Sequence, residues 1–239
     1  MPVTKPFKRI WRPGSYEYLE DERYATGSEQ LLRAYEVIVQ DLTKVFEYVE
    51  PVKDNMATHS HRLYELLLRA STEFETNCKG ILSDNGYPKE AAHLDISDYS
   101  KIEVACRLSE YEVTLMLCSP PWTMRPFADW KTPQGRLGWY QAYNAVKHDR
   151  SREFRRASLA NVLDAVAGLL VILYAQFGFR VFYPYHPPGI FFESDEGLVV
   201  ASETSIFTVD PPKWGQEDHY QFDGRAVAQS SDPFQRFPF

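Results

Sequence analysis

Apolar residues in the first part of the chain recur in alternating steps of four and three, the spacing that places side chains on one face of a helix. The pattern predicts a helix from Ser28, with Thr26 and Glu29 spaced as a capping box and Pro51 as its end. So narrow an apolar stripe needs another helix packed against it. The stripe consists of Leu31, Tyr35, Ile38, Leu42, Val45 and Val49.

A second helix is predicted from about Thr58 to Leu82, because apolar residues again follow helical spacing. Asn85-Gly86 supplies the stop after it. The other side of this helix is charged, and Glu75 and Lys79 stand one turn apart with opposite sign. We therefore expect one face of the helix in the core and the other in solvent.

The most apolar pattern runs from Phe154 to Phe177, with Ser151 as its expected N-cap and Gly178 as its stop. Its most hydrophobic part, residues 165–179, is 15 residues long. A membrane-spanning helix needs about 20 apolar residues. We therefore expect a buried core helix and no membrane partner.

Residues 86–131 differ from the helical segments, because Tyr111–Leu117 alternates as a strand does and several prolines follow it. Residues 190–192, 198–201 and 205–209 are expected to form a small antiparallel meander. The predicted fold is mainly α: a four-helix bundle with a partly extended insertion and a small C-terminal antiparallel β appendage. Its parts are an N-terminal arm (1–25), the bundle (26–178, insertion at about 86–131), and the β appendage with a proline and aromatic tail (179–239).

The third long helix is predicted to begin at Thr132-Pro133 and to continue unbroken to Arg150. Asn144 and His148 then stand one turn apart on one stripe, with Lys147 and Arg150 beside it. This stripe is too polar for an ordinary core. It is the first candidate for a functional site.

Asn144-Ala145-Val146-Lys147-His148, on the third long helix of a four-helix arrangement, resembles the motif of the HEPN domains. That motif is an arginine, commonly followed by asparagine, then a few residues and a histidine. The usual place of the arginine is occupied here by Tyr143. The resemblance implies a homodimer in which two copies of the motif meet, and a polar residue of the second helix, Glu75 or Lys79, that supports the site.

Metal-independent RNA cleavage needs a general base, a general acid and cations that stabilise the phosphorane. Histidine titrates near neutrality, so His148 is the expected acid or base, with Asn144 to orient it or hold the substrate. The candidate phosphate-binding residues are Lys147, Arg150, Arg152 and Arg155. The resemblance thus implies a HEPN-like protein acting on RNA or another phosphate-containing ligand, such as an endoribonuclease of a toxin, phage-defence or stress system.

A non-catalytic reading stays open beside the enzymatic one. Asn144 and His148 can form a structural pair next to Trp139, Tyr140 and Tyr143, while Asp149 and the arginines form a solvated network. The protein would then be a non-catalytic, dimeric HEPN-like module that binds a protein partner. A solvent-open His148 beside cations favours the enzyme, and a dry, packed His148 favours the module.

The net charge of −7 argues against a protein that coats nucleic acid through its overall charge. Residues 147–156 nevertheless carry a local charge of +3, which leaves −10 for the rest and permits a local anion site.

Common phosphate-loop, dinucleotide, zinc-protease and hydrolase motifs are absent from the sequence, and no cofactor is expected. His59 and His61 stand two apart without a carboxylate or cysteine cluster, so no metal site is expected there. Three cysteines without close spacing and an N-terminus without an apolar run predict a cytoplasmic protein.

Overall fold

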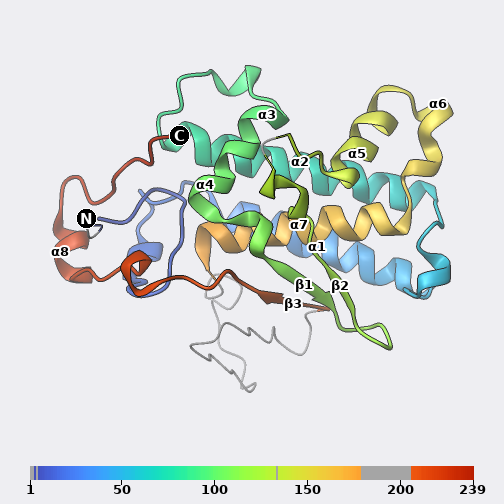
Figure 1. Ribbon diagram of the computed structural model, residues 1–239, viewed down its shortest axis with the longest axis horizontal. Helices are drawn as coiled ribbons and strands as arrows, with labels where there is room; N and C mark the ends of the chain where they lie inside the picture. Colours follow the sequence, from blue (N-terminus) through green and yellow to red (C-terminus); the bar gives the residue numbers. More distant parts are fainter. Residues whose placement is uncertain (1–2, 4, 133, 179–205) are drawn as a thin grey trace.

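The structure is a computed structural model that describes residues 3, 5–132, 134–178 and 206–239. A bundle of helices occupies its centre, and a small sheet lies along one side (Figure 1). Both chain termini gather at one end of the bundle, together with α8 (Gly224–Gln229), which we call the terminal end. The opposite end carries α6 (Arg150–Glu153) and is called the α6 end.

Two long helices, α2 (His61–Asp84) and α7 (Leu159–Phe177), form the centre of the bundle. Both α1 (Ser28–Phe46) and α5 (Gly138–His148) pack against this central pair. The apolar stripe of α1 faces the core through buried Tyr35, Ile38, Leu42 and Val45. The mainly helical fold and its helical bundle are therefore as the periodicity predicts.

Helix α7 spans 19 residues, and its length and hydropathy are those of a membrane-spanning segment. It is longer than the apolar stretch of the sequence because its first turns also form helix. Within the bundle, 83% of the most apolar 18-residue stretch of this helix is buried. Such burial is typical of the core helix of a soluble protein.

The starts of the first two helices differ from the predictions in detail. Gly27, with a φ of 75°, takes the N-cap position of α1 and makes no side-chain cap, so the predicted capping box of Thr26 and Glu29 is wrong. A left-handed backbone at this position suits glycine, which has no Cβ to clash. Helix α2 begins at His61, where the Ser60 hydroxyl accepts a hydrogen bond from the Leu63 amide at 3.2 Å.

The predicted start of the third helix at Thr132 is also wrong, since α5 begins at Gly138 and has no side-chain cap. It ends at His148 because Asp149 leaves the helical region, with φ −142° and ψ 71°. Asp149 then caps α6 by accepting from the Arg152 amide at 3.3 Å.

Ser151 is not the cap of the core helix, because its hydroxyl donates to the Asp149 carboxylate at 2.7 Å. A 3-10 turn at Phe154–Arg156 follows α6. Ser158 then caps α7 by accepting from the Asn161 amide at 3.4 Å. Asp149 and Ser158 thus both act as N-caps, Asp149 of α6 and Ser158 of α7, because the segment divides into two helices.

The insertion contains two short helices, α3 (Ile96–Tyr99) and α4 (Glu103–Cys106), followed by two strands. Strand β1 (Glu112–Leu115) pairs antiparallel with β2 (Trp122–Met124), in register Thr114 with Thr123. The alternation that predicted a strand over residues 111–117 is therefore confirmed in its central part. Trp130 and Phe127 anchor the insertion by packing against Phe74 of α2.

Strand β3 (Phe207–Asp210) lies on the other side of β1, so the sheet order is β2-β1-β3 with both pairs antiparallel. The predicted strand at 205–209 is thus present with shifted bounds. It pairs with the insertion, in register Thr208 with Thr114. The other two predicted strands, at 190–192 and 198–201, lie outside the described residues.

The N-terminal arm packs at the terminal end through aromatic side chains. Trp11 meets Tyr174 of α7 edge to face, with ring centroids 5.5 Å apart. Tyr18 lies between Tyr24 and Tyr220, at 5.1 Å and 5.6 Å. The arm therefore joins the C-terminal tail to the core.

Candidate functional site

The candidate site lies on the last turns of α5, which the core holds firmly at its other end. Trp139 is buried and its indole donates to the Pro126 carbonyl at 3.0 Å. Gly168 of α7 lies opposite, where a Cβ atom would come within 3.1 Å of the Trp139 ring. The close approach fixes α5 on α7, while the final turn of α5 projects towards the α6 end (Figure 1).

The polar stripe of α5 faces solvent at this end. His148 and Lys147 are exposed, and Asn144 is half-buried. The side chains of Asn144 and His148 make no hydrogen bond or ion pair with another described residue, so the hydrogen-bonded pair of the non-catalytic reading is not formed. Both side chains are thus open to a ligand.

A chain of polar and aromatic contacts links α2 to this stripe. The Tyr140 hydroxyl donates to Glu75 Oε1 at 2.7 Å, and the Tyr140 and Tyr143 rings lie 5.4 Å apart. Burial raises the pKa of Tyr140, and the hydrogen bond to Glu75 raises it further. The chain therefore keeps a neutral phenol between the carboxylate of α2 and the surface of α5.

Tyr143, at the usual place of the family's arginine, is only 2% exposed. Lys147 Nζ donates to the Tyr143 hydroxyl at 2.9 Å and also lies 4.9 Å from the centre of the ring. The hydrogen bond that Lys147 donates to Tyr143 raises the pKa of Lys147. The phenol thus brings no charge itself, but it positions a cation directly above it.

Of the two supporting residues predicted on α2, the structure brings one to the site. Glu75 contacts Tyr140 and so reaches the α5 stripe through one intermediate side chain. The predicted pair of Glu75 with Lys79 is not formed, because the carboxylate is engaged by the phenol instead. The Lys79 side chain makes no hydrogen bond or ion pair with any described residue.

The arginines after the motif differ in how they are engaged. Arg150 lies over the Tyr64 ring of α2, with its guanidinium carbon 5.8 Å from the ring centre. Arg152 forms a long ion pair of 3.7 Å with Asp149, and it is 85% exposed. Arg155 is exposed and forms no ion pair within the described part of the chain. Arg150 and Arg155 are therefore the arginines most available to an anion.

Sequence reasoning missed an aromatic cluster that stands beside these cations. The Phe154 ring lies between His59, His61 and Tyr64, with centroid distances of 5.7, 4.9 and 6.0 Å. His59 pairs with Ser158 in an isolated antiparallel bridge, which brings the starts of α2 and α7 side by side. The spacing of the two histidines is visible in the sequence, but their contact with Phe154 is not.

No family model, curated protein or solved structure matches this chain in the comparisons with known proteins. The local resemblance at Asn144 and His148 is thus accompanied by no match over the whole chain. We therefore infer function from the geometry of the α6 end.

Asp164 of α7 is a half-buried carboxylate without a hydrogen bond or ion pair to any described residue. Burial raises its pKa from 3.8 to about 6. The unpaired charge opposes folding at neutral pH.

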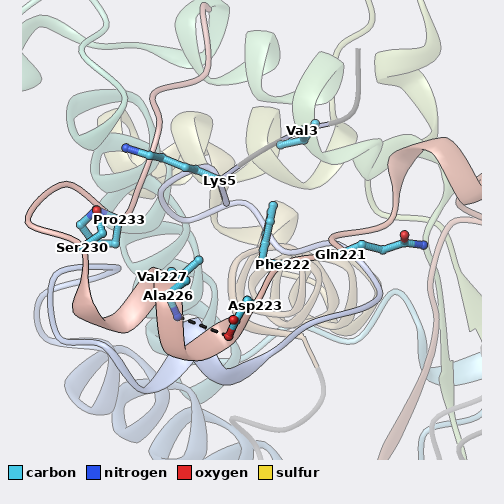
Figure 2. Close-up of a pocket in the computed structure, with 9 residues that line it drawn as sticks. All are labelled: Val3, Lys5, Gln221, Phe222, Asp223, Ala226, Val227, Ser230 and Pro233. Atoms are coloured by element: carbon cyan, nitrogen blue, oxygen red, sulfur yellow. Dashed lines mark hydrogen bonds between the residues drawn. The ribbon is translucent and has the colours of Figure 1, made fainter.

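A cavity of about 430 Å³ lies at the terminal end, between the N-terminal arm and α8 (Figure 2). Its apolar lining includes Val3, Phe222 and Val227. Its charged side chains have structural partners, because Lys5 pairs with Asp232 and Asp223 caps α8. No predicted site residue lines this cavity.

Within the described ranges, no group of three or more His, Cys, Asp or Glu side chains is placed to hold a metal ion.

Proposed function

We propose that this chain is a HEPN-like protein that acts on RNA as a metal-independent endoribonuclease, with the catalytic face at the α6 end of the bundle. The observation that carries the proposal is the solvent-open His148, with Asn144 one turn before it and the exposed cations Lys147, Arg150 and Arg155 nearby. Such a combination provides an acid or base and a phosphate-binding surface in one place. A toxin, phage-defence or stress system is the biological setting that we infer from the resemblance.

Lys147 supports the proposal in spite of the missing arginine. Its ammonium is held on the Tyr143 hydroxyl, above the position that the family gives to arginine. A cation so placed can stabilise the charge that develops on the phosphorane oxygens. We infer that Lys147 takes over the electrostatic role, with Tyr143 as the residue that positions it.

The reaction that we propose requires two imidazoles. One neutral imidazole accepts the proton of the ribose 2'-hydroxyl as its oxygen attacks phosphorus. The bond to the 5'-oxygen breaks, and a protonated imidazole gives that oxygen a proton, which leaves a 2',3'-cyclic phosphate and a 5'-hydroxyl. Because the motif carries a single histidine, we propose a homodimer in which the His148 residues of two copies face one substrate.

The test is RNA cleavage in the presence of EDTA, comparing the wild type with His148→Ala at the same oligomeric state. We expect the substitution to lower the cleavage rate by about 100-fold or more, as for the loss of a general acid or base. His93→Ala is the matched control, because His93 is an exposed histidine outside the site, with 72% of its side chain accessible. The control should cleave at the wild-type rate.

A second candidate is the non-catalytic, dimeric HEPN-like module that binds a protein partner. Tyr143 favours it, because a buried phenol takes the place of the family's arginine. Absence of cleavage by wild type and by both variants, with an intact dimer, would support this module and reject the ribonuclease. Equal cleavage by wild type and His148→Ala would assign any activity to another residue.

A further inference from the structure

The aromatic cluster at the α6 end has the composition of a surface that binds single-stranded nucleic acid. His59 and His61 are exposed, and Phe154 and Tyr64 are half-buried beside them. The cluster joins residues from the start of α2 to the turn after α6. Aromatic faces at a surface provide stacking platforms for bases.

The cations continue this cluster towards His148. Arg150 lies over Tyr64, which in turn contacts Phe154, so side-chain contacts run without a gap from the guanidinium to the histidines. Arg155 follows Phe154 directly and is exposed. The positive ends of the α2 and α7 dipoles lie beside each other at the bridge between His59 and Ser158 and add to the positive field.

The carboxylates of the α6 segment and one carboxylate near the start of α2 are already engaged. Asp149 caps α6 and pairs with Arg152, and Glu153 pairs with Arg156 at 2.5 Å. Glu65 pairs with Arg62 at 3.0 Å. The remaining cations, Arg150 and Arg155, therefore face solvent without a carboxylate partner among the described residues.

We propose that single-stranded RNA crosses the α6 end, with a base stacked on the cluster formed by His59, His61, Tyr64 and Phe154 and its phosphates on Arg150 and Arg155. This assignment rests on the proposed ribonuclease function and names how the substrate is held. An unpaired strand is the form that fits, since a base must leave its stack to reach an aromatic side chain. The strand then leads towards Asn144 and His148.

Binding is tested with a short single-stranded 2'-O-methyl oligonucleotide, which lacks the attacking hydroxyl and cannot be cleaved. Its affinity is measured against salt for the wild type and for the double variant Arg150→Gln, Arg155→Gln. Each lost phosphate contact should lower the slope of log affinity against log salt by roughly 0.7, so the double variant should lose about 1.4. Arg33→Gln with Arg125→Gln is the matched control, because it removes two exposed arginines elsewhere.

Stacking is tested with Phe154→Leu, which keeps an apolar side chain but removes the ring. We expect affinity for the oligonucleotide to fall about fivefold or more, the usual effect of losing one base-stacking side chain. Tyr16→Leu, at an exposed aromatic residue of the N-terminal arm, should leave the affinity unchanged. If Phe154→Leu does not fold, His61→Ala replaces it, because His61 is exposed and its loss also weakens the platform.

The outcomes separate this inference from the ribonuclease itself. The proposed strand path alone would be overturned if Phe154→Leu and the double arginine variant bound the oligonucleotide with wild-type affinity while cleavage still depended on His148. Neither binding nor cleavage by the wild type would overturn both. Equal affinity for polyglutamate and for the oligonucleotide would overturn the assignment to RNA in favour of an acidic protein partner.

Discussion

Two arginines at opposite ends of the bundle differ in whether the fold satisfies their charge. At the terminal end, Arg9 is 7% exposed and its guanidinium contacts Asp84, Gln176 and the Thr26 carbonyl at 2.5, 3.2 and 3.2 Å. At the α6 end, Arg155 is exposed and contacts no described carboxylate. The first arrangement satisfies the charge within the fold, and the second leaves it for a ligand.

The same contrast holds for the polar groups around these cations. Gln176 of α7 accepts from Arg9 and donates to Asn77 of α2 at 2.8 Å, so buried polar groups at the terminal end satisfy one another. At the α6 end, Asn144 and His148 have no such partners among the described residues. One end of α2 and α7 therefore joins the arm to the core, while the other offers polar side chains to solvent.

The largest expected effect comes from breaking the buried network with Arg9→Ala. The substitution leaves Asp84 and Gln176 without their donor, and we expect it to lower the free energy of unfolding by about 2–4 kcal/mol. Urea denaturation followed by circular dichroism measures the change. Arg150→Ala is the comparison at the α6 end and should stay within about 0.5 kcal/mol of wild type.

Similar losses of stability in Arg9→Ala and Arg150→Ala would contradict the contrast between the two ends. A large loss at Arg150 alone would show that its contact with Tyr64 is structural.

A smaller effect is expected at Asp164, the one partly buried carboxylate in the first turns of α7 that lacks a described partner. Its folded-state pKa of about 6 exceeds the ordinary value of 3.8, so the folded protein binds the proton more tightly than the unfolded chain does. This favours folding when the carboxyl is protonated, and the advantage is lost as pH rises through about 6. Asp164→Asn should therefore stabilise the protein at pH 7, by about 1–3 kcal/mol.

The check is urea denaturation of Asp164→Asn and wild type at several pH values. The difference should be greatest above pH 6 and should disappear below the ordinary carboxyl value of 3.8. If the difference in free energy of unfolding between Asp164→Asn and wild type does not vary with pH, the asparagine acts by changing the packing, and the charge of Asp164 does not contribute. Asp223→Asn, at the cap of α8, controls for the loss of one carboxylate elsewhere.

The sequence predicted the helices whose apolar side chains must be buried in the core. Spacing alone located α1, α2 and α7, because each of these helices must turn one apolar face, or in α7 nearly all of its surface, into the core. The choice of caps could not be predicted in this way. Asp149, Ser151 and Ser158 are all suited to an N-cap, and local spacing does not show that the segment divides into α6, capped by Asp149, and α7, capped by Ser158.

The candidate site was predictable as a stripe on α5 and no further. Asn144, Lys147 and His148 share a helix, so their proximity follows from the sequence. The contacts of Glu75 with Tyr140 and of His61 with Phe154 join segments far apart in the chain, and nothing in local spacing encodes them. The pairing of β3 with β1 is hidden for the same reason.

The smallest effect on stability, and the sharpest test of the contrast, is expected from Tyr143→Phe. The variant keeps the buried ring and its contact with the Lys147 ammonium but removes the hydroxyl that accepts from Lys147. Because Lys147 itself is exposed, we expect a loss of at most about 0.5 kcal/mol in the free energy of unfolding by urea denaturation. If Tyr143 positions Lys147 for catalysis, cleavage of RNA should fall by about tenfold while affinity for the uncleavable oligonucleotide stays the same, since a misplaced transition-state contact lowers the rate and leaves ground-state binding unchanged. Tyr87→Phe is the matched control, because it also removes a phenol hydroxyl that accepts from a lysine, Lys101, away from the site. Unchanged cleavage by Tyr143→Phe, with wild-type stability, would mean that the Tyr143 hydroxyl has no part in positioning Lys147 for catalysis.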